Sequence, residues 1–274
     1  MITFPNAKIN LGLNVTERRP DGYHNIETVF LPVAVTDVLE IVPAQHGKAT
    51  TLATYGRPVE CEPEKNLVMK AARLMQRQYD VPELEIHLTK VIPHGAGLGG
   101  GSSDATFTLL MLNEMFNLGL DDGTLAALAA TLGADCPFFV YNRPMLATGI
   151  GDQFTPVEID LTGKWLYLVK PKVYVPTAQA YAGIKPEQPT RSLAADLRQP
   201  LSQWQGNVKN DFEPSVFALH PVLADIKKRL LAAGAEYAAM SGSGSSMFAI
   251  CPSVNVAEAM RGIVDAECDF VSAL

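Results

Sequence analysis

A glycine tract at residues 93–106, PHGAGLGGGSSDAT, is the part of this 274-residue chain whose composition points most directly to chemistry. Glycine loses more conformational entropy on folding than other residues, so such a tract is unfavourable unless bare backbone is needed. Successive backbone amides before a helix can bind an anion, and the hydroxyls of Ser102 and Ser103 add donors or a magnesium contact. The tract therefore predicts a phosphate-binding loop, and the missing GxxxxGK[ST] pattern excludes the Walker type.

Two other interpretations of the tract remain open. A flexible surface loop is disfavoured because the tract lies between an expected strand and an expected helix. Gly95, Gly97 and Gly100 also satisfy the GxGxxG pattern of dinucleotide-binding loops. That pattern requires a later strand ending in an acidic residue, and here a second helix is expected instead. A nicotinamide-dependent oxidoreductase is therefore the weaker alternative.

Three further features could take part in the same chemistry. MSGSGSSMF at residues 240–248 lies between two apolar segments, which favours a ligand-binding loop over a linker. Lys8 and Asn10 lie on the polar side of an alternating strand, and Asp135 follows Gly133 at an expected helix end. Taken alone, a strand lysine is usually solvated, and an acid at that place is usually a turn residue.

The elements that must position these residues follow from hydrophobic periodicity. A half-buried strand is expected at residues 8–18, a hairpin of two strands at 28–44, and a surface excursion at 185–206. Further strands are expected at 84–92, 165–171, 236–240 and 247–252, helices at 64–79, 102–118, 121–133, 177–184 and 221–234, and a last helix and strand within 255–273. Strands and helices mix without strict alternation, which predicts the α+β class. A boundary near 155 gives two domains, residues 1–155 and 156–274.

Composition excludes several classes of protein. Apolar residues make up 47% of the chain and charged residues 19%, as in globular proteins. The net charge of −7 argues against a nucleic-acid partner. The four cysteines show no zinc spacing and are expected to be buried free thiols in a reducing compartment. The sequence shows neither a secretory leader nor an apolar run of about 18 residues, so we expect a cytoplasmic protein with no membrane partner.

Three segments resemble, in order, the three motifs of the GHMP kinases, the superfamily of galactokinase, homoserine kinase, mevalonate kinase and phosphomevalonate kinase: PNAKINLGLNV, GLGGGSSDAT and SGSGSS. RPDGYHNIETVF, KNLVMKAARLM and LGADCPFFV are similar to the branch that acts on a cytidine diphosphate-linked methylerythritol, and the likeness covers nearly the whole chain. The resemblance implies a ribosomal S5 domain 2-like N-terminal domain, which binds ATP and carries catalysis, and a ferredoxin-like C-terminal domain, which binds substrate. It further implies phosphorylation of the 2-hydroxyl of 4-diphosphocytidyl-2-C-methyl-D-erythritol, with release of ADP, in the non-mevalonate route to isoprenoid precursors.

The resemblance also assigns roles to residues. Asp135 would be the general base, and Lys8 would keep it ionised and stabilise charge at the transferred phosphate. The ATP site would comprise Asn66, near the adenine, and the loop Pro93, His94, Gly95, Ala96, Gly97, Leu98, Gly99, Gly100, Gly101, Ser102 and Ser103. The substrate site would comprise Asn10, Tyr23, His24, Phe30, Thr177, Tyr181, Gly242, Ser243 and Gly244. Tyr181 departs from the phenylalanine of a relative but keeps a ring for stacking on cytosine.

The implied cofactors are ATP and Mg²⁺, and no residue is assigned as a metal ligand. Asp104 is interpreted as a first-turn helix acid without a chemical role. The partner is a small-molecule substrate, and the protein is expected to be a monomer or homodimer. Two alternatives remain beside the oxidoreductase: another kinase of the superfamily with a different alcohol substrate, and a non-catalytic nucleotide-binding protein with the same fold.

Overall fold

The chain divides into two units of interleaved segments in a computed structural model that describes residues 1–59 and 61–274. Unit 1 comprises Met1–Ala7, Val35–His94 and Gly99–Arg143; unit 2 comprises Lys8–Ala34, Gly95–Leu98 and Pro144–Leu274. Both units mix helices and strands, which confirms the α+β class. The domain boundary near residue 155 stays a prediction.

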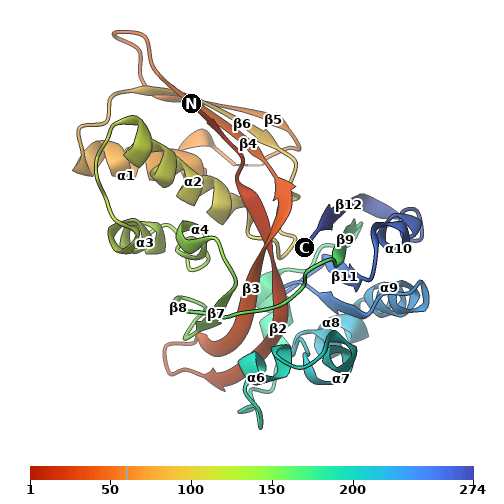
Figure 1. The fold of residues 1–274 in the computed structure, drawn as a ribbon. Coiled ribbons are helices and arrows are strands. Elements are labelled where there is room, and N and C mark those ends of the chain that lie inside the picture. The colour runs from red at the N-terminus through yellow and green to blue at the C-terminus, as the bar shows by residue number, and fades with distance from the viewer. Residues whose placement is uncertain (60) are drawn as a thin grey trace. The chain divides into compact units, whose positions relative to one another are not determined.

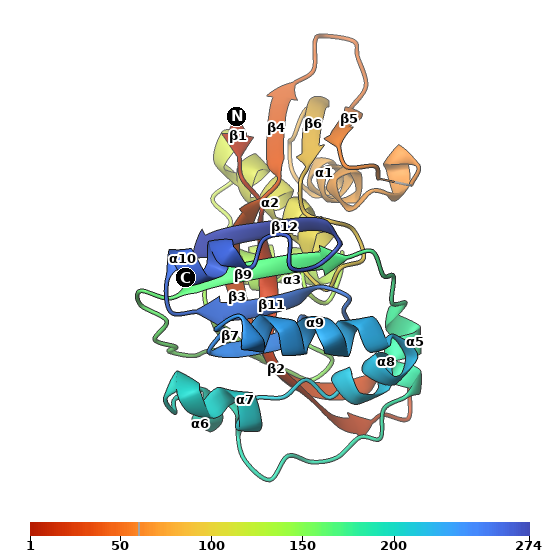
Figure 2. The ribbon, with the colours of Figure 1, turned by 90° about the vertical axis from the view of Figure 1, so that its right-hand side faces the viewer.

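Unit 1 is built on a four-stranded sheet, whose strands β4, β5 and β6 are labelled in Figure 1 and whose order β1-β4-β6-β5 can be followed in Figure 2. Strand β5 runs parallel to β6, whereas the other pairs are antiparallel. The strands are β1 Ile2–Thr3, β4 Val38–Pro43, β5 Thr51–Gly56 and β6 Leu84–Lys90. The helices are η1 Pro63–Lys65, α1 Leu67–Gln78, α2 Gly100–Met115, α3 Asp122–Ala130 and α4 Phe138–Tyr141. Apolar side chains of β4 and β6 pack with those of α1 and α2 in one core.

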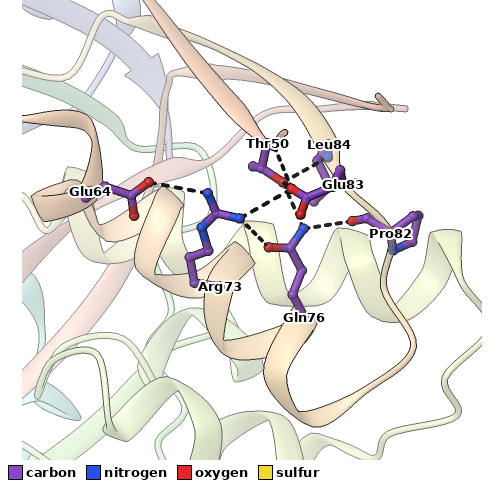
Figure 3. A network of polar contacts seen from close by, with 7 residues as sticks. All are labelled: Thr50, Glu64, Arg73, Gln76, Pro82, Glu83 and Leu84. Carbon is purple, nitrogen blue, oxygen red and sulfur yellow. Dashed lines mark hydrogen bonds and ion pairs between the residues drawn. The ribbon is translucent and has the colours of Figure 1, made fainter. Parts of the chain in front are cut away.

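A polar network joins helix α1 to neighbouring segments of unit 1 (Figure 3). Arg73 and Gln76 reach from α1, and the Glu83 carboxylate precedes β6. Arg73 donates to Glu83 and to Glu64, while Gln76 Nε2 donates to Thr50 Oγ1 at 2.8 Å. Thr50 in turn donates from its backbone and hydroxyl to Glu83. The network therefore fixes α1 against the entry to β6.

Unit 2 contains an antiparallel four-stranded sheet of order β10-β11-β9-β12 and most of a second sheet of order β2-β3-β7-β8. The strands are β2 Asn6–Arg18, β3 His24–Thr36, β7 Met145–Thr148, β8 Gln153–Pro156, β9 Trp165–Pro171, β10 Tyr237–Met240, β11 Met247–Cys251 and β12 Ala266–Ala273. The helices are α5 Thr177–Ala182, α6 Leu193–Leu197, η2 Leu201–Gln203, α7 Trp204–Asn207, α8 Glu213–Leu219, α9 Pro221–Ala232 and α10 Val254–Ala259. Helices α9 and α10 lie against the first sheet and share its core (Figure 2).

Most elements expected from periodicity are confirmed, but the hairpin at residues 28–44 is wrong. Strands β3 and β4 both form, yet they lie in different sheets. Asp37 separates them, and its backbone N donates to Pro5 O at 2.9 Å rather than closing a turn. Helix α2 also begins at Gly100, two residues before the expected start, and ends at Met115.

Two expectations about burial also need correction. The segment at residues 185–206 is not wholly a surface excursion, because Leu193, Leu197 and Trp204 are buried. The Trp204 ring meets Tyr237 edge-on, with ring centroids 5.8 Å apart. All four cysteines are free, and Cys136 and Cys251 are buried as expected, but Cys61 is exposed and Cys268 is half-buried. None of the helices in the described part of the chain is long and apolar enough to cross a membrane.

Candidate active site

The glycine tract forms the turn that leads into helix α2. Gly99 caps this helix with a backbone φ of +69°, a left-handed conformation that other residues adopt only with strain. Ser103 N donates the first intrahelical bond, to Gly99 O at 2.9 Å. The amides of residues 100–102 therefore precede the helical ladder, and the helix dipole adds positive potential there. This is the geometry of an anion site at a helix N-terminus.

The tract packs against the second glycine–serine stretch. A Cβ atom at Gly97 would lie 2.1 Å from the carbonyl oxygen of Ser241, far inside van der Waals contact. Ser241 Oγ donates to Gly97 O at 2.9 Å, and Ser246 N donates to Ala96 O at 3.3 Å. The bare backbone at residue 97 is thus required by the protein's own packing.

A buried asparagine helps to hold the 241–246 turn in place. Asn210 Nδ2 donates to Met240 O and to Gly242 O, each at 2.8 Å, and its Oδ1 accepts from Phe212 N. Ser243 Oγ and Thr177 Oγ1 lie 3.2 Å apart, which brings these two predicted substrate residues together. Sequence reasoning missed Asn210, since nothing in the local pattern shows that an asparagine is buried.

Lys8 is buried on strand β2, with 4% of its surface exposed, so the solvated-lysine interpretation is wrong. Its Nζ donates to Asn10 Oδ1 at 2.8 Å and lies 4.5 Å from the ring centre of Phe30. Asn10 Nδ2 donates in turn to Thr28 Oγ1. The Lys8 backbone N donates to Leu98 O at 2.9 Å, which places the strand beside the glycine tract.

The expected half-buried character of β2 is also wrong, because residues 7–13 are buried on both sides of the strand. Charged and amide groups in such surroundings require partners. Asn10 and Phe30 are partners of the Lys8 ammonium group, and Thr28 is a partner of the Asn10 amide. These contacts fix the orientation of the Lys8 ammonium group. Thr28 was missed because its register against β2 is a property of the sheet.

Asp135 lies in unit 1, in the turn between α3 and α4, and is partly exposed. Thr106 Oγ1 on α2 donates to Cys136 O at 2.8 Å, and Ser102 shares a side-chain hydrogen bond with Cys136. The turn is therefore tied to the first turns of α2. Burial raises the pKa of the Cys136 thiol to about 11, so this cysteine remains protonated and is a poor nucleophile.

The start of helix α1 lies beside the start of α2. Asn66 caps α1 as expected, accepting from Val68 N at 2.9 Å. Leu67 Cδ1 lies 3.8 Å from the position of a Cβ atom on Gly101. The structure thus places Asn66 next to the glycine tract, while its contact with adenine stays a prediction. Within the tract, Pro93 is buried and His94 is exposed.

Two of the predicted cytosine-binding rings, His24 and Tyr181, lie close together in unit 2. His24 stacks on Tyr181, with centroids 4.8 Å apart and planes 24° apart. Tyr181 also meets Phe212 edge-on. Tyr23 is 63% exposed, which leaves its ring free for a ligand face. The face of Tyr181 on which His24 stacks is therefore occupied in this structure.

Comparisons with known proteins identify the family. The sequence patterns of the GHMP kinases N terminal domain and of the GHMP kinases C terminal domain match residues 66–143 and 191–269. A Bacteroides fragilis protein named 4-diphosphocytidyl-2-C-methyl-D-erythritol kinase is 54% identical over 251 residues, covering 91% of this chain and 92% of that protein. The chain belongs to the GHMP kinase family, in the branch of the 4-diphosphocytidyl-2-C-methyl-D-erythritol kinases.

Solved GHMP kinase structures agree with this assignment. A crystal structure of 4-(cytidine 5'-diphospho)-2C-methyl-D-erythritol kinase superposes with a TM-score of 0.84 at 34% identity, covering 99% of this chain and 98% of that one. Homoserine kinase from Cytophaga hutchinsonii gives 0.71 at 21% identity, with 98% and 94% covered, and shows the shared fold alone. The oxidoreductase alternative is excluded, because helix α3, and no strand, follows α2.

Two further observations bear on what a GHMP kinase of this kind could bind. Among the described residues, no cluster of three or more histidine, cysteine or acidic side chains could hold a metal ion. A pocket of about 550 Å³ in unit 2 is lined by residues such as Thr16, Arg19 and Arg191. None of the predicted site residues lines this pocket.

Proposed function

We propose that the protein transfers the γ-phosphoryl group of ATP to the 2-hydroxyl of 4-diphosphocytidyl-2-C-methyl-D-erythritol, releasing ADP. The observation that carries the proposal is the identity of 54% to a relative bearing that kinase name, over 91% of this chain. The local geometry supports it. A helix N-terminus built on glycines suits phosphate, and the backbone N of Lys8, whose side chain is buried, donates to Leu98 O in the same tract.

We assign the phosphates of ATP to the amides of residues 100–102 and to the loop before them. The Ser102 side chain is hydrogen-bonded to the Cys136 side chain, whereas the buried Ser103 Oγ has no hydrogen-bond partner among the described residues. Ser103 is therefore the hydroxyl best suited to a phosphate oxygen or a magnesium ligand. Magnesium bound with ATP would neutralise charge on the phosphate oxygens. Asn66 stays our choice for the adenine end.

We assign proton transfer to Asp135 and charge stabilisation to Lys8. Asp135 accepts the proton of the substrate's 2-hydroxyl while the oxygen of that hydroxyl bonds to the γ-phosphorus of ATP. The bond between this phosphorus and the leaving ADP breaks. The Lys8 ammonium, oriented by Asn10 and Phe30, stabilises the negative charge on the transferring group. Tyr23, His24 and Tyr181 hold the cytosine. The cytoplasmic location and the monomeric or homodimeric state stay predictions.

The experiment that tests the function is an ADP-release assay with magnesium ATP and four alcohols. These are 4-diphosphocytidyl-2-C-methyl-D-erythritol, mevalonate, homoserine and galactose. We expect ADP release with the cytidylyl compound alone. Release with another alcohol would keep the phosphate loop and discard the cytosine site. A folded protein that binds ATP but releases ADP with none of them would be a non-catalytic member of the fold.

A further inference from the structure

Three charged side chains are buried together beside the glycine tract, all within unit 1. Lys90 is the last residue of β6, Asp37 lies between β3 and β4, and Asp104 lies in helix α2. Lys90 Nζ donates to Asp104 Oδ2 at 2.6 Å and also to Asp37 Oδ2. Asp104 is 2% exposed and lies beyond the first turn of α2, so the interpretation as a first-turn helix acid is wrong.

The cluster reaches the backbone on the entry side of the tract. Asp37 Oδ1 accepts from Val91 N at 2.5 Å and from Ile92 N at 2.9 Å. These two residues lead directly from β6 into Pro93. The Asp37 carboxylate therefore fixes the path of the chain before the first glycine.

The cluster also reaches the exit side, where α2 begins. Asp104 is the fifth residue of α2, so its ion pair with Lys90 ties this helix to the end of β6. A Cβ atom at Gly100 would lie 2.8 Å from Ile92 Cγ2 and 3.4 Å from Lys90 Nζ. Glycine at residue 100 thus permits the close packing of the helix start on the residues that the cluster holds.

The charges in the cluster favour a geometric role over a stabilising one. Replacing buried ion pairs with apolar groups is often neutral for stability, so a cluster of this kind is weak support for the fold alone. Burial raises the pKa of Asp104, and the Asp37 charge adds to the shift against the opposing effect of Lys90. Burial opposes the charged form of Lys90, yet attraction to Asp104 and Asp37 raises its pKa. Lys90 therefore remains a cation that links both sides of the tract.

We propose that Asp37, Lys90 and Asp104 are positioning residues that fix the entry and the exit of the glycine tract, and so set its geometry for a nucleotide phosphate. The inference rests on the proposed function for what the tract binds. The ion pairs that join the two sides are independent of that function. None of the three side chains is assigned a contact with substrate.

The test compares two substitutions of Asp104 in the full-length protein. Asp104→Leu removes the tie to α2 while the Lys90–Asp37 pair stays charge-balanced. Asp104→Asn keeps an oxygen that accepts from Lys90 and should act as the conservative rescue. Arg73→Met is the control, because it cuts the ion pairs at the opposite end of β6. Asp104→Ala, which adds no volume, is the second variant should the leucine disturb folding.

Three readouts separate positioning from folding: the melting temperature, the affinity for magnesium ATP by calorimetry, and amide exchange over residues 91–104. We expect Asp104→Leu to melt as a cooperative unit, bind magnesium ATP about tenfold or more weakly and exchange faster across the tract. Asp104→Asn and Arg73→Met should retain wild-type affinity and tract exchange.

A folded Asp104→Leu or Asp104→Ala variant with unchanged affinity and unchanged tract exchange would overturn the proposal. Equal losses in Arg73→Met would do so too, because they would show that any loss of stability in unit 1 weakens binding. If the wild-type protein itself fails to bind magnesium ATP, the proposed function falls. Tract exchange in the variants then decides the positioning role separately.

Discussion

The close contact between the glycine tract and the 241–246 turn can be tested by adding a single methyl group at residue 97. Gly97→Ala places a Cβ atom 2.1 Å from Ser241 O and 3.5 Å from Gly244 N. Carbon and oxygen atoms rarely lie closer than about 3.3 Å, so the 241–246 turn must move by about 1 Å. That movement stretches the Ser241 Oγ to Gly97 O hydrogen bond and the Ser246 N to Ala96 O hydrogen bond.

The expected loss of stability in Gly97→Ala has two contributions. Alanine at the φ of +76° observed for Gly97 costs about 1–2 kcal/mol relative to glycine. Weakening the two hydrogen bonds costs about 0.5–1.5 kcal/mol each. The free energy of unfolding should therefore fall by roughly 2–5 kcal/mol. A displacement of 1 Å at a phosphate loop is expected to lower kcat/KM about a hundredfold.

A second glycine supplies a matched control. Gly163 has the same φ of +76°, but a Cβ atom there would meet nothing within 4 Å. Gly163→Ala therefore carries the backbone strain without the contact. Urea unfolding and kcat/KM should both be measured for the two variants. If Gly97→Ala loses no more stability than Gly163→Ala and keeps its activity, the approach to Ser241 is not what requires glycine at residue 97.

Three other predictions concern the proposed reaction and the buried cluster. Asp135→Asn should lower kcat about 10²- to 10⁴-fold with ATP affinity unchanged, and substantial residual turnover would reject Asp135 as the base. Tyr23→Ala should raise KM for the cytidylyl substrate more than KM for ATP, whereas Tyr181→Phe should leave both near wild type; equal effects of Tyr23→Ala on the two KM values would contradict stacking. Burial raises the pKa of Asp104 from 3.8 to about 7, so the folded state binds the extra proton and stability falls as pH rises from about 4 to about 7. Melting curves across that range should lose this slope in Asp104→Asn, and an unchanged slope would show that another group titrates.

The local sequence pattern was sufficient to predict helices and strands whose own residues show a clear periodicity. Strand β6 and helix α1 follow from alternation and from a helical apolar stripe, and the Asn66 cap follows from its place before that stripe. Strand pairing is a long-range property, however. Two apolar runs separated by Asp37 resemble a hairpin, yet their partners lie elsewhere, β7 for β3 and β6 for β4. No glycine or asparagine marks a turn there.

Burial of isolated residues was harder to predict for a related reason. Trp204 and Leu193 stand in a polar, proline-bearing stretch, and only the tertiary fold shows that both are buried. The motif residues Lys8 and Ser243 were predicted as site residues because their segments resemble a known family. Thr28, which accepts from Asn10, and Asn210, which donates to Gly242 O, were missed, since strand register and the path of a distant segment bring them to these positions.

The structural reason for glycine differs from one position of the tract to the next. Packing explains Gly97 and Gly100, and the left-handed cap explains Gly99. Gly101 differs, because a Cβ atom there meets only Leu67 Cδ1, at an ordinary 3.8 Å. Alanine inside a helix is favoured over glycine by about 0.5–1 kcal/mol, so Gly101→Ala should stabilise the fold. If a phosphate must approach this backbone, the same change weakens ATP binding. Higher stability with undiminished ATP affinity would show that the ligand does not approach residue 101.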